Sequence, residues 1–248
     1  MSFASIEFIF YFLPLAILII FFVEFFRWQK FTLLIFLIIS LAFYAWHSIP
    51  HLLLLLALVS VTWSCGSIYV RLQGMRLHLL ATLSLSIGLA TNLGALFIWK
   101  YSASLVELWN TLDLIQFKSP DLILPLGISF YVLQQLGFLL DLRLGRAKSG
   151  SLLEYATFIT FFPQLLSGPI VTYRHMIKEF DRVMVGRLWN ERINMLALSV
   201  PWIIFGLFKK VVLSDTLSSK ITPLMEKAAN VGISSLEAWM IALACFPI

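Results

Sequence analysis

Long runs of apolar residues, separated by short polar breaks, dominate the chain. They cover residues 8–26, 31–46, 52–70, 77–99, 122–140, 152–171, 195–207 and 238–248. A helix needs about 20 apolar residues to cross a bilayer. The pattern therefore predicts an all-α membrane protein, a polytopic helical bundle with about seven to eight membrane segments. Residues 102–121 and 172–193 mix charged with apolar positions, which predicts amphipathic helices in the membrane interface.

The run at residues 152–171 differs from the others because Pro163 and the triplet Ser167-Gly168-Pro169 interrupt it. Irregular backbone at membrane depth persists only where protein or a water-filled cavity surrounds it. Basic residues flank the run on both sides, at Arg143, Arg146, Lys148, Arg174 and Lys178. Because cytoplasmic loops collect Lys and Arg, both ends are expected on one side of the membrane. The pattern predicts a re-entrant element, with a Pro-kinked ordinary span as the alternative.

Basic residues fall on alternate loops, and this bias orients the expected spans. They follow the first, third and fifth runs, at Arg27, Lys30, Arg71, Arg76, Arg143, Arg146 and Lys148. The loop at residues 47–51 has neither Lys nor Arg. The basic loops are therefore predicted to face the cytoplasm and the N-terminus to be extracytoplasmic. The pattern leaves open on which side Lys209 and Lys210 lie.

Composition supports a membrane location and a lipid partner. The chain is 60% hydrophobic and 12% charged, whereas about a quarter of the residues in a globular domain are charged. Its net charge of +5 is scattered between apolar runs, which indicates loop charge beside anionic lipid. Without a basic stripe, no nucleic-acid partner is expected. The two cysteines, Cys65 and Cys245, lie far apart and have no metal-ligand spacing, so no metal site is predicted.

Residues that catalyse reactions in soluble enzymes are sparse. The four histidines, His47, His51, His78 and His175, all lie near the ends of predicted segments. The chain has no HExxH, GxSxG, P-loop or dinucleotide-binding motif. No catalytic residue is therefore predicted. The spans also lack the interior carboxylate that is typical of a proton or cation pathway, and no internal repeat is visible.

Polar residues within the later apolar runs are the candidate binding residues. A pocket for a polar ligand is predicted at Ser129, Gln134, Pro163, Gln164, Gly168, Pro169, Lys209 and Lys210. Ser129 and Gln134 follow Pro125-Leu126-Gly127 within the run 122–140. Helix packing through small polar side chains is the alternative explanation for Ser129.

Three motifs follow one another along the chain, residues 124–131 (LPLGISFY), 161–170 (FFPQLLSGPI) and 206–217 (GLFKKVVLSDTL). They resemble the membrane-bound O-acyltransferase family (MBOAT), in particular its bacterial alginate O-acetylation branch. Weaker agreement at residues 43–46, 100–101 and 238–244 extends the resemblance over essentially the whole chain. Three motifs in the same order and at compatible spacing are a more specific signal than any one of them.

The resemblance implies a helical core with re-entrant elements and a tunnel, which the candidate residues would line. It implies that an acyl group, typically acetyl, passes from a cytoplasmic thioester such as acetyl-CoA to an extracytoplasmic polysaccharide or envelope polymer. An extracytoplasmic acetyltransferase is an expected partner protein, and the cell inner membrane is the expected location. No bound cofactor is implied, because the thioester is a substrate.

The family's catalytic histidine segment, of the type Trp-Arg-Arg-Trp-His, is absent from this sequence. Residues 1–248 are therefore expected to form the N-terminal part of a single transmembrane domain, truncated and inactive alone. Acyl transfer to a hydroxyl needs a general base, and none of the four histidines has the family context. A transporter or channel subunit and a non-catalytic membrane scaffold are the alternatives.

The topology can be tested with single cysteines at Ser149 and Thr172 in a protein that lacks Cys65 and Cys245. Both should react with an impermeant maleimide from the cytoplasmic side only, because both ends of the interrupted run are predicted there. Labelling of Ser149 from outside alone would reverse the predicted orientation. Labelling of the two positions from opposite sides would make residues 152–171 an ordinary kinked span.

Overall fold

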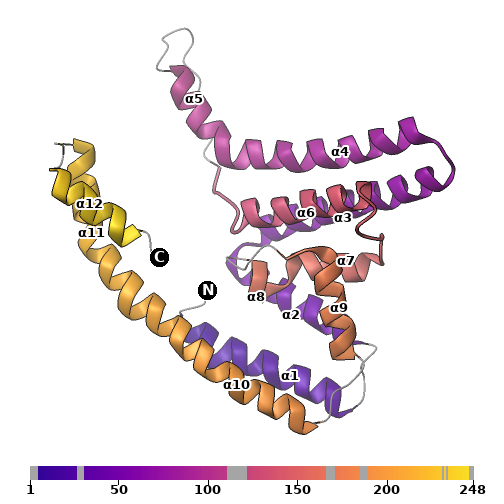
Figure 1. Cartoon of the computed structure of the whole chain (residues 1–248), viewed down its shortest axis with the longest axis horizontal. Coiled ribbons are helices and arrows are strands. Elements are labelled where there is room, and N and C mark those ends of the chain that lie inside the picture. Colours follow the sequence, from indigo (N-terminus) through magenta and orange to yellow (C-terminus); the bar gives the residue numbers. More distant parts are fainter. Residues whose placement is uncertain are drawn as a thin grey trace. The chain divides into compact units, whose positions relative to one another are not determined.

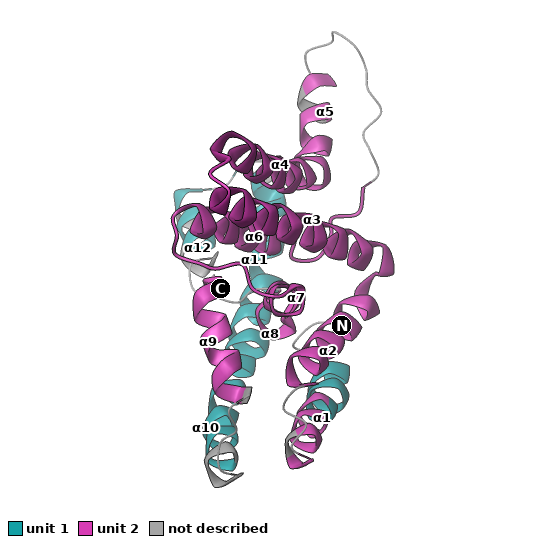
Figure 2. Ribbon diagram, turned by 90° about the vertical axis from the view of Figure 1, so that its right-hand side faces the viewer, with its two compact units in different colours: residues 1–15, 187–248 teal, residues 16–186 magenta. Residues whose placement is uncertain are grey.

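In the computed structural model, every regular element in the part of the chain that is described is a helix (Figure 1). The structure describes residues 5–26, 31–110, 122–165, 171–184, 189–230, 232 and 234–245. For these residues the expected all-α class is confirmed. The helices fall into two units, residues 16–186 and residues 1–15 with 187–248 (Figure 2).

The larger unit is built on a hairpin of two helices, α3 (Ile49–Gly74) and α4 (His78–Leu96). The preceding helix, α2 (Thr32–His47), ends where Ser48 turns extended and caps α3 by accepting a hydrogen bond from the His51 amide at 3.4 Å. Within the hairpin, Asn92 donates to the Thr62 hydroxyl at 2.7 Å, and Ser84 donates to the Cys65 carbonyl at 2.8 Å. These buried hydrogen bonds hold two apolar helices in a fixed register.

A third helix, α6 (Ile128–Arg143), packs against both helices of the hairpin through their glycines. A Cβ atom at Gly66 would lie 2.8 Å from Leu142 Cδ1. One at Gly88 would lie 3.0 Å from Leu139 Cδ1 and 3.1 Å from Cys65 Cβ. Small residues let apolar helices approach closely enough for extensive van der Waals contact.

The interrupted run forms two short helices, α7 (Leu152–Thr160) and α8 (Phe162–Leu165), which both pack against α2. A capping box between Ser151 and Glu154 starts α7. The helix stops at Phe161, which turns extended with a ψ of 106°. Continuing α7 through Pro163 would cost a backbone hydrogen bond and a ring clash with an earlier carbonyl, so the chain breaks just before it.

The chain then returns to the point where the interrupted run began. Helix α9 (Tyr173–Met184) packs against α7, and the Tyr173 hydroxyl donates to Glu154 Oε2 at 3.4 Å. A straight helix of 20 residues would instead separate its ends by about 30 Å. This geometry favours the re-entrant interpretation of residues 152–171 over an ordinary span. The triplet Ser167-Gly168-Pro169 lies outside the described residues.

The smaller unit contains three consecutive elements that form one long helix. They are α10 (Trp189–Phe208), the π-helix η4 (Lys209–Ser214) and α11 (Asp215–Asn230). Helix α12 (Ser235–Cys245) packs back on α11, with Lys227 Nζ 2.8 Å from Glu237 Oε1. The apolar run 195–207 thus lies within a helix that continues past Lys209 and Lys210. Near the N-terminus, η1 (Phe8–Phe12) leads directly into α1 (Leu13–Phe25).

Three helices among the described residues are long and apolar enough to cross a membrane, namely Ile49–Gly74, His78–Val106 and Ile193–Ala228. Two shorter apolar helices are Phe8–Val23 and Thr32–His47. The expected count of seven to eight spans is thus not confirmed. The fourth run is longer than expected because η3 (Phe97–Tyr101) and α5 (Ser102–Asn110) continue α4 into the stretch predicted to be a separate interfacial helix.

The close approach at Gly88 predicts that alanine has different effects on stability at two glycines of α4, Gly88 and Gly94. Gly88→Ala should lower the thermal unfolding temperature in detergent, because overpacking costs about 1–3 kcal/mol. Gly94→Ala is the matched control, since nothing lies within 4 Å of its Cβ position. That change should be neutral or stabilising, because a helix interior favours Ala over Gly by roughly 0.5–1 kcal/mol. Equal unfolding temperatures for the two variants would contradict the packing.

Candidate functional site

The candidate site begins with two hydroxyl side chains on α2 that hydrogen-bond backbone groups at the starts of two other helices. The Tyr44 hydroxyl donates to the Leu126 carbonyl at 2.9 Å, just before α6 begins. The Ser40 hydroxyl accepts from the Phe162 amide at 3.2 Å, at the break between α7 and α8. Both side chains are buried. One face of α2 therefore satisfies the backbone at two interruptions that the sequence places 36 residues apart.

The same two interruptions contact each other through Gly127. This residue caps α6 with a φ of +72°, a conformation that glycine adopts without steric cost. A Cβ atom there would lie only 2.7 Å from the Leu165 carbonyl oxygen at the end of α8. The sequences LPLGISFY and FFPQLLSGPI thus meet at this point. Phe43 adds a ring contact to Phe162, with centroids 5.7 Å apart.

About two turns along α6 from Gly127, this helix carries two buried glutamines. Gln134 is 5% exposed and Gln135 is fully buried. The Tyr155 hydroxyl of α7 lies 3.5 Å from Gln135 Oε1. Gln134 Oε1 and Gln135 Nε2 have no hydrogen-bond partner among the described residues. Because an unpaired buried amide costs about 1–3 kcal/mol, both atoms are suited to receive water or the polar part of a ligand.

The structure separates the eight predicted site residues into groups. Gln134 and Gln164 are both buried in the larger unit, whereas Pro163 is exposed. Ser129 is half-buried at the start of α6, where its hydroxyl accepts from Lys100 Nζ at 3.1 Å. Gly168 and Pro169 lie outside the described residues.

Lys209 and Lys210 lie in η4, which belongs to the smaller unit. Both are exposed, and Lys210 forms an ion pair with Asp215. A π-helical turn within an α-helix often marks a functional position. Their predicted role as part of the ligand site stays a prediction.

Sequence reasoning missed Ser40, Tyr44 and Tyr155 as members of this site. Each is a hydroxyl residue within an otherwise apolar helix, and this was the available signal. The helical period alone does not reveal which hydroxyl meets a break in another segment. Among the described residues, no three His, Cys, Asp or Glu side chains gather as metal ligands would.

These features define a class, a multi-pass helical membrane protein with a broken helix and a neutral polar interior. A family model described as MBOAT, membrane-bound O-acyltransferase family, matches residues 39–247. The chain therefore belongs to this family, as the sequence motifs predicted.

Several relatives agree with this membership. The peptidoglycan O-acetyltransferase of Helicobacter pylori is 29% identical in an alignment that covers 96% of this chain and 48% of the relative. A probable alginate O-acetylase AlgI of Pseudomonas aeruginosa is 26% identical, with coverages of 88% and 41%. A teichoic acid D-alanyltransferase of Lacticaseibacillus rhamnosus is 27% identical over 42% of this chain and 25% of its own length. No solved structure gives a significant match.

This chain spans less than half the length of these curated relatives, between 25% and 48%. The residues that match the family model, 39–247, include Ser40, Tyr44, Gly127 and Leu165. The activities named for the relatives belong to longer proteins.

The contact at Gly127 can be tested against a second glycine with the same backbone conformation. Gly127→Ala should lower the unfolding temperature more than Gly145→Ala does. Both residues have positive φ, +72° and +68°, but nothing lies within 4 Å of the Gly145 Cβ position. The left-handed conformation costs alanine roughly 1–2 kcal/mol at either site, and only Gly127→Ala adds a backbone clash. Equal losses would show that Gly127 does not hold the two segments together.

Proposed function

We propose that this chain is the N-terminal portion of a multi-pass membrane O-acyltransferase of the cell inner membrane. The acyl group, most simply acetyl, is transferred from acetyl-CoA or another thioester to an extracytoplasmic polysaccharide or related envelope polymer. The observation that carries the proposal is the junction of the family motifs on α2, where Tyr44 and Gly127 join the start of α6 to the end of α8. The names of the relatives support the class of acceptor.

The proposed reaction moves an acyl carbon from sulfur to oxygen. The acceptor hydroxyl attacks the thioester carbonyl, a C–O bond forms, and the C–S bond breaks. The hydroxyl proton passes to a general base, and the thiolate leaves and takes up a proton. In this scheme the buried amides of Gln134 and Gln135 line the path of the neutral acyl group, where their unpaired atoms can hydrogen-bond its carbonyl or accompanying water.

The charge distribution supports this function over a proton or cation transporter. Among the described residues, no Asp, Glu, Lys or Arg side chain is buried. Ion pathways through membranes normally contain such groups. A neutral polar interior suits an uncharged acyl group. An extracytoplasmic acetyltransferase that receives the group is the partner that we propose.

The 248-residue protein alone should transfer no acetyl group from acetyl-CoA in reconstituted vesicles. A positioned general base contributes about 10²–10⁴-fold, and none of the four histidines here has the family's catalytic context. Supplying the C-terminal half of the family's length, fused or co-expressed, should restore transfer, measured as radiolabelled acetyl on a polysaccharide acceptor. Transfer by the chain alone that is lost in His175→Ala or His78→Ala would overturn this expectation.

In the complemented enzyme, Gln134→Leu should lower transfer, because it removes a buried amide from the acyl path. Gln73→Leu is the matched control, since Gln73 lies near the end of α3 and bonds Tyr69 and His78. Equal activities of the two variants would remove Gln134 from the proposed path.

A further inference from the structure

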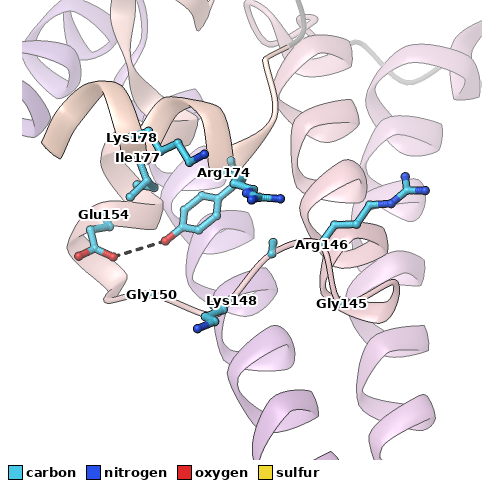
Figure 3. Close-up of a pocket in the computed structure, with 10 residues that line it drawn as sticks. Gly145, Arg146, Lys148, Gly150, Glu154, Arg174, Ile177 and Lys178 are labelled. Carbon is cyan, nitrogen blue, oxygen red and sulfur yellow. Dashed lines mark hydrogen bonds between the residues drawn. The ribbon is translucent and has the colours of Figure 1, made fainter. Parts of the chain in front are cut away.

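A second feature of the larger unit is a pocket of about 440 Å³ (Figure 3). It lies where the loop between α6 and α7 meets the first turns of α9. The pocket is lined by Gly145, Arg146, Ala147, Lys148, Gly150, Glu154, Tyr173, Arg174, Ile177 and Lys178. It contains none of the residues that we assign to the acyl path.

Positive charge dominates this pocket. Arg146 and Lys148 come from the loop, and Arg174 and Lys178 come from successive turns of α9 (Figure 3). All four side chains are exposed, and none forms an ion pair within the described part of the chain. The apolar face of α9 is already buried against the protein, so its charged face is left for solvent or a ligand.

Glu154, the one acidic side chain among the described residues of the lining, is already engaged in the pocket wall. Its Oε2 atom accepts from the Ser151 amide at 3.1 Å and from the Tyr173 hydroxyl at 3.4 Å. Burial, followed by the nearby Glu154 carboxylate, raises the pKa of Tyr173, which keeps this hydroxyl protonated as a donor. The carboxylate therefore holds α9 to α7 and leaves the four cations unneutralised.

The loop that carries Arg146 and Lys148 is held in place by hydrogen bonds to α3. Trp63 Nε1 donates to the Gly150 carbonyl at 3.0 Å, and the Ser149 and Ser67 hydroxyls lie 3.0 Å apart. A Cβ atom at Gly150 would lie 2.1 Å from Glu154 Oε2 and 2.3 Å from the Tyr173 hydroxyl. A glycine is thus needed where the loop crosses the start of α7. This framework places the basic side chains before any ligand arrives, which lowers the entropy cost of binding.

From these observations we propose that the pocket binds a phosphate-bearing anion. Arg and Lys side chains are the usual partners of phosphate oxygens, and the volume exceeds that of a single phosphate group. The phosphate can belong to an anionic lipid headgroup or to a soluble phosphorylated molecule. For a soluble ligand the proposal rests on the proposed function, in which the donor is a phosphorylated thioester. Binding is measured without acyl transfer, so failure of this proposal and failure of the proposed function are distinguishable.

The test uses the 248-residue protein in nanodiscs. For a soluble phosphate, the probe is 3′,5′-adenosine diphosphate, titrated against protein in phosphatidylcholine alone. For a headgroup, the probe is a fluorescent phosphatidylglycerol at low mole fraction in phosphatidylcholine, measured by energy transfer from tryptophan. Lys148→Gln with Lys178→Gln should weaken binding of one probe about tenfold or more, and added salt should weaken it further.

The control removes the same charge elsewhere in the larger unit, by Arg71→Gln with Arg76→Gln, at two exposed positions outside the pocket. It should leave binding within about twofold of the wild type. Loss confined to the nucleotide assigns the pocket to a soluble phosphate, and loss confined to the lipid assigns it to a headgroup. If neither probe binds the wild type, or if both double variants behave alike, the proposal is wrong. Because all four changed side chains are exposed, unfolding temperatures should stay equal.

Discussion

Backbone that leaves the helix inside an apolar protein needs hydrogen-bond partners, and the larger unit depends on how that need is met. Two hydroxyls of α2 meet it, Tyr44 at the Leu126 carbonyl and Ser40 at the Phe162 amide. These bonds allow the chain to break before α6 and again between α7 and α8. The breaks in turn permit the contact at Gly127.

The lengths of the hydrophobic runs predicted where helices lie along the chain. They did not predict where a helix begins or ends when a glycine or a pair of lysines lies at the edge of the run. The run 52–70 lies within α3, because Ser48 and Pro50 give that helix a clear start. The run 122–140 yields a helix only from Ile128, because Gly127 adopts a left-handed conformation. The run 195–207 continues as a helix past Lys209 and Lys210, whose long side chains stay exposed. Two lysines can thus interrupt an apolar pattern without ending a helix.

Two buried amides of the candidate site could be picked out from the sequence, but the contacts that surround them could not. Gln134 and Gln164 stood out as amides in apolar runs, and both are buried. Ser40 and Tyr155 gave a weaker signal, because hydroxyl residues are common in membrane helices and often only pack. Ser40 contacts Phe162, which is 122 residues away in the sequence, and Tyr155 contacts Gln135, which is 20 residues away. Such contacts follow from tertiary packing, which local periodicity does not encode.

The larger unit also keeps charge apart from neutral polarity over a short distance. On α7, Glu154 lines the basic pocket, while the next residue, Tyr155, reaches Gln135 in the interior. The ring of Phe138 contacts Tyr155 on the interior side and Tyr173 of the pocket lining, with centroids 4.5 Å and 5.0 Å away. Moving a charged group past such rings costs far more than moving a neutral carbonyl. A phosphorylated ligand held by the pocket would therefore stay at the rim, and only an uncharged part of a substrate could occupy the space beside the glutamines.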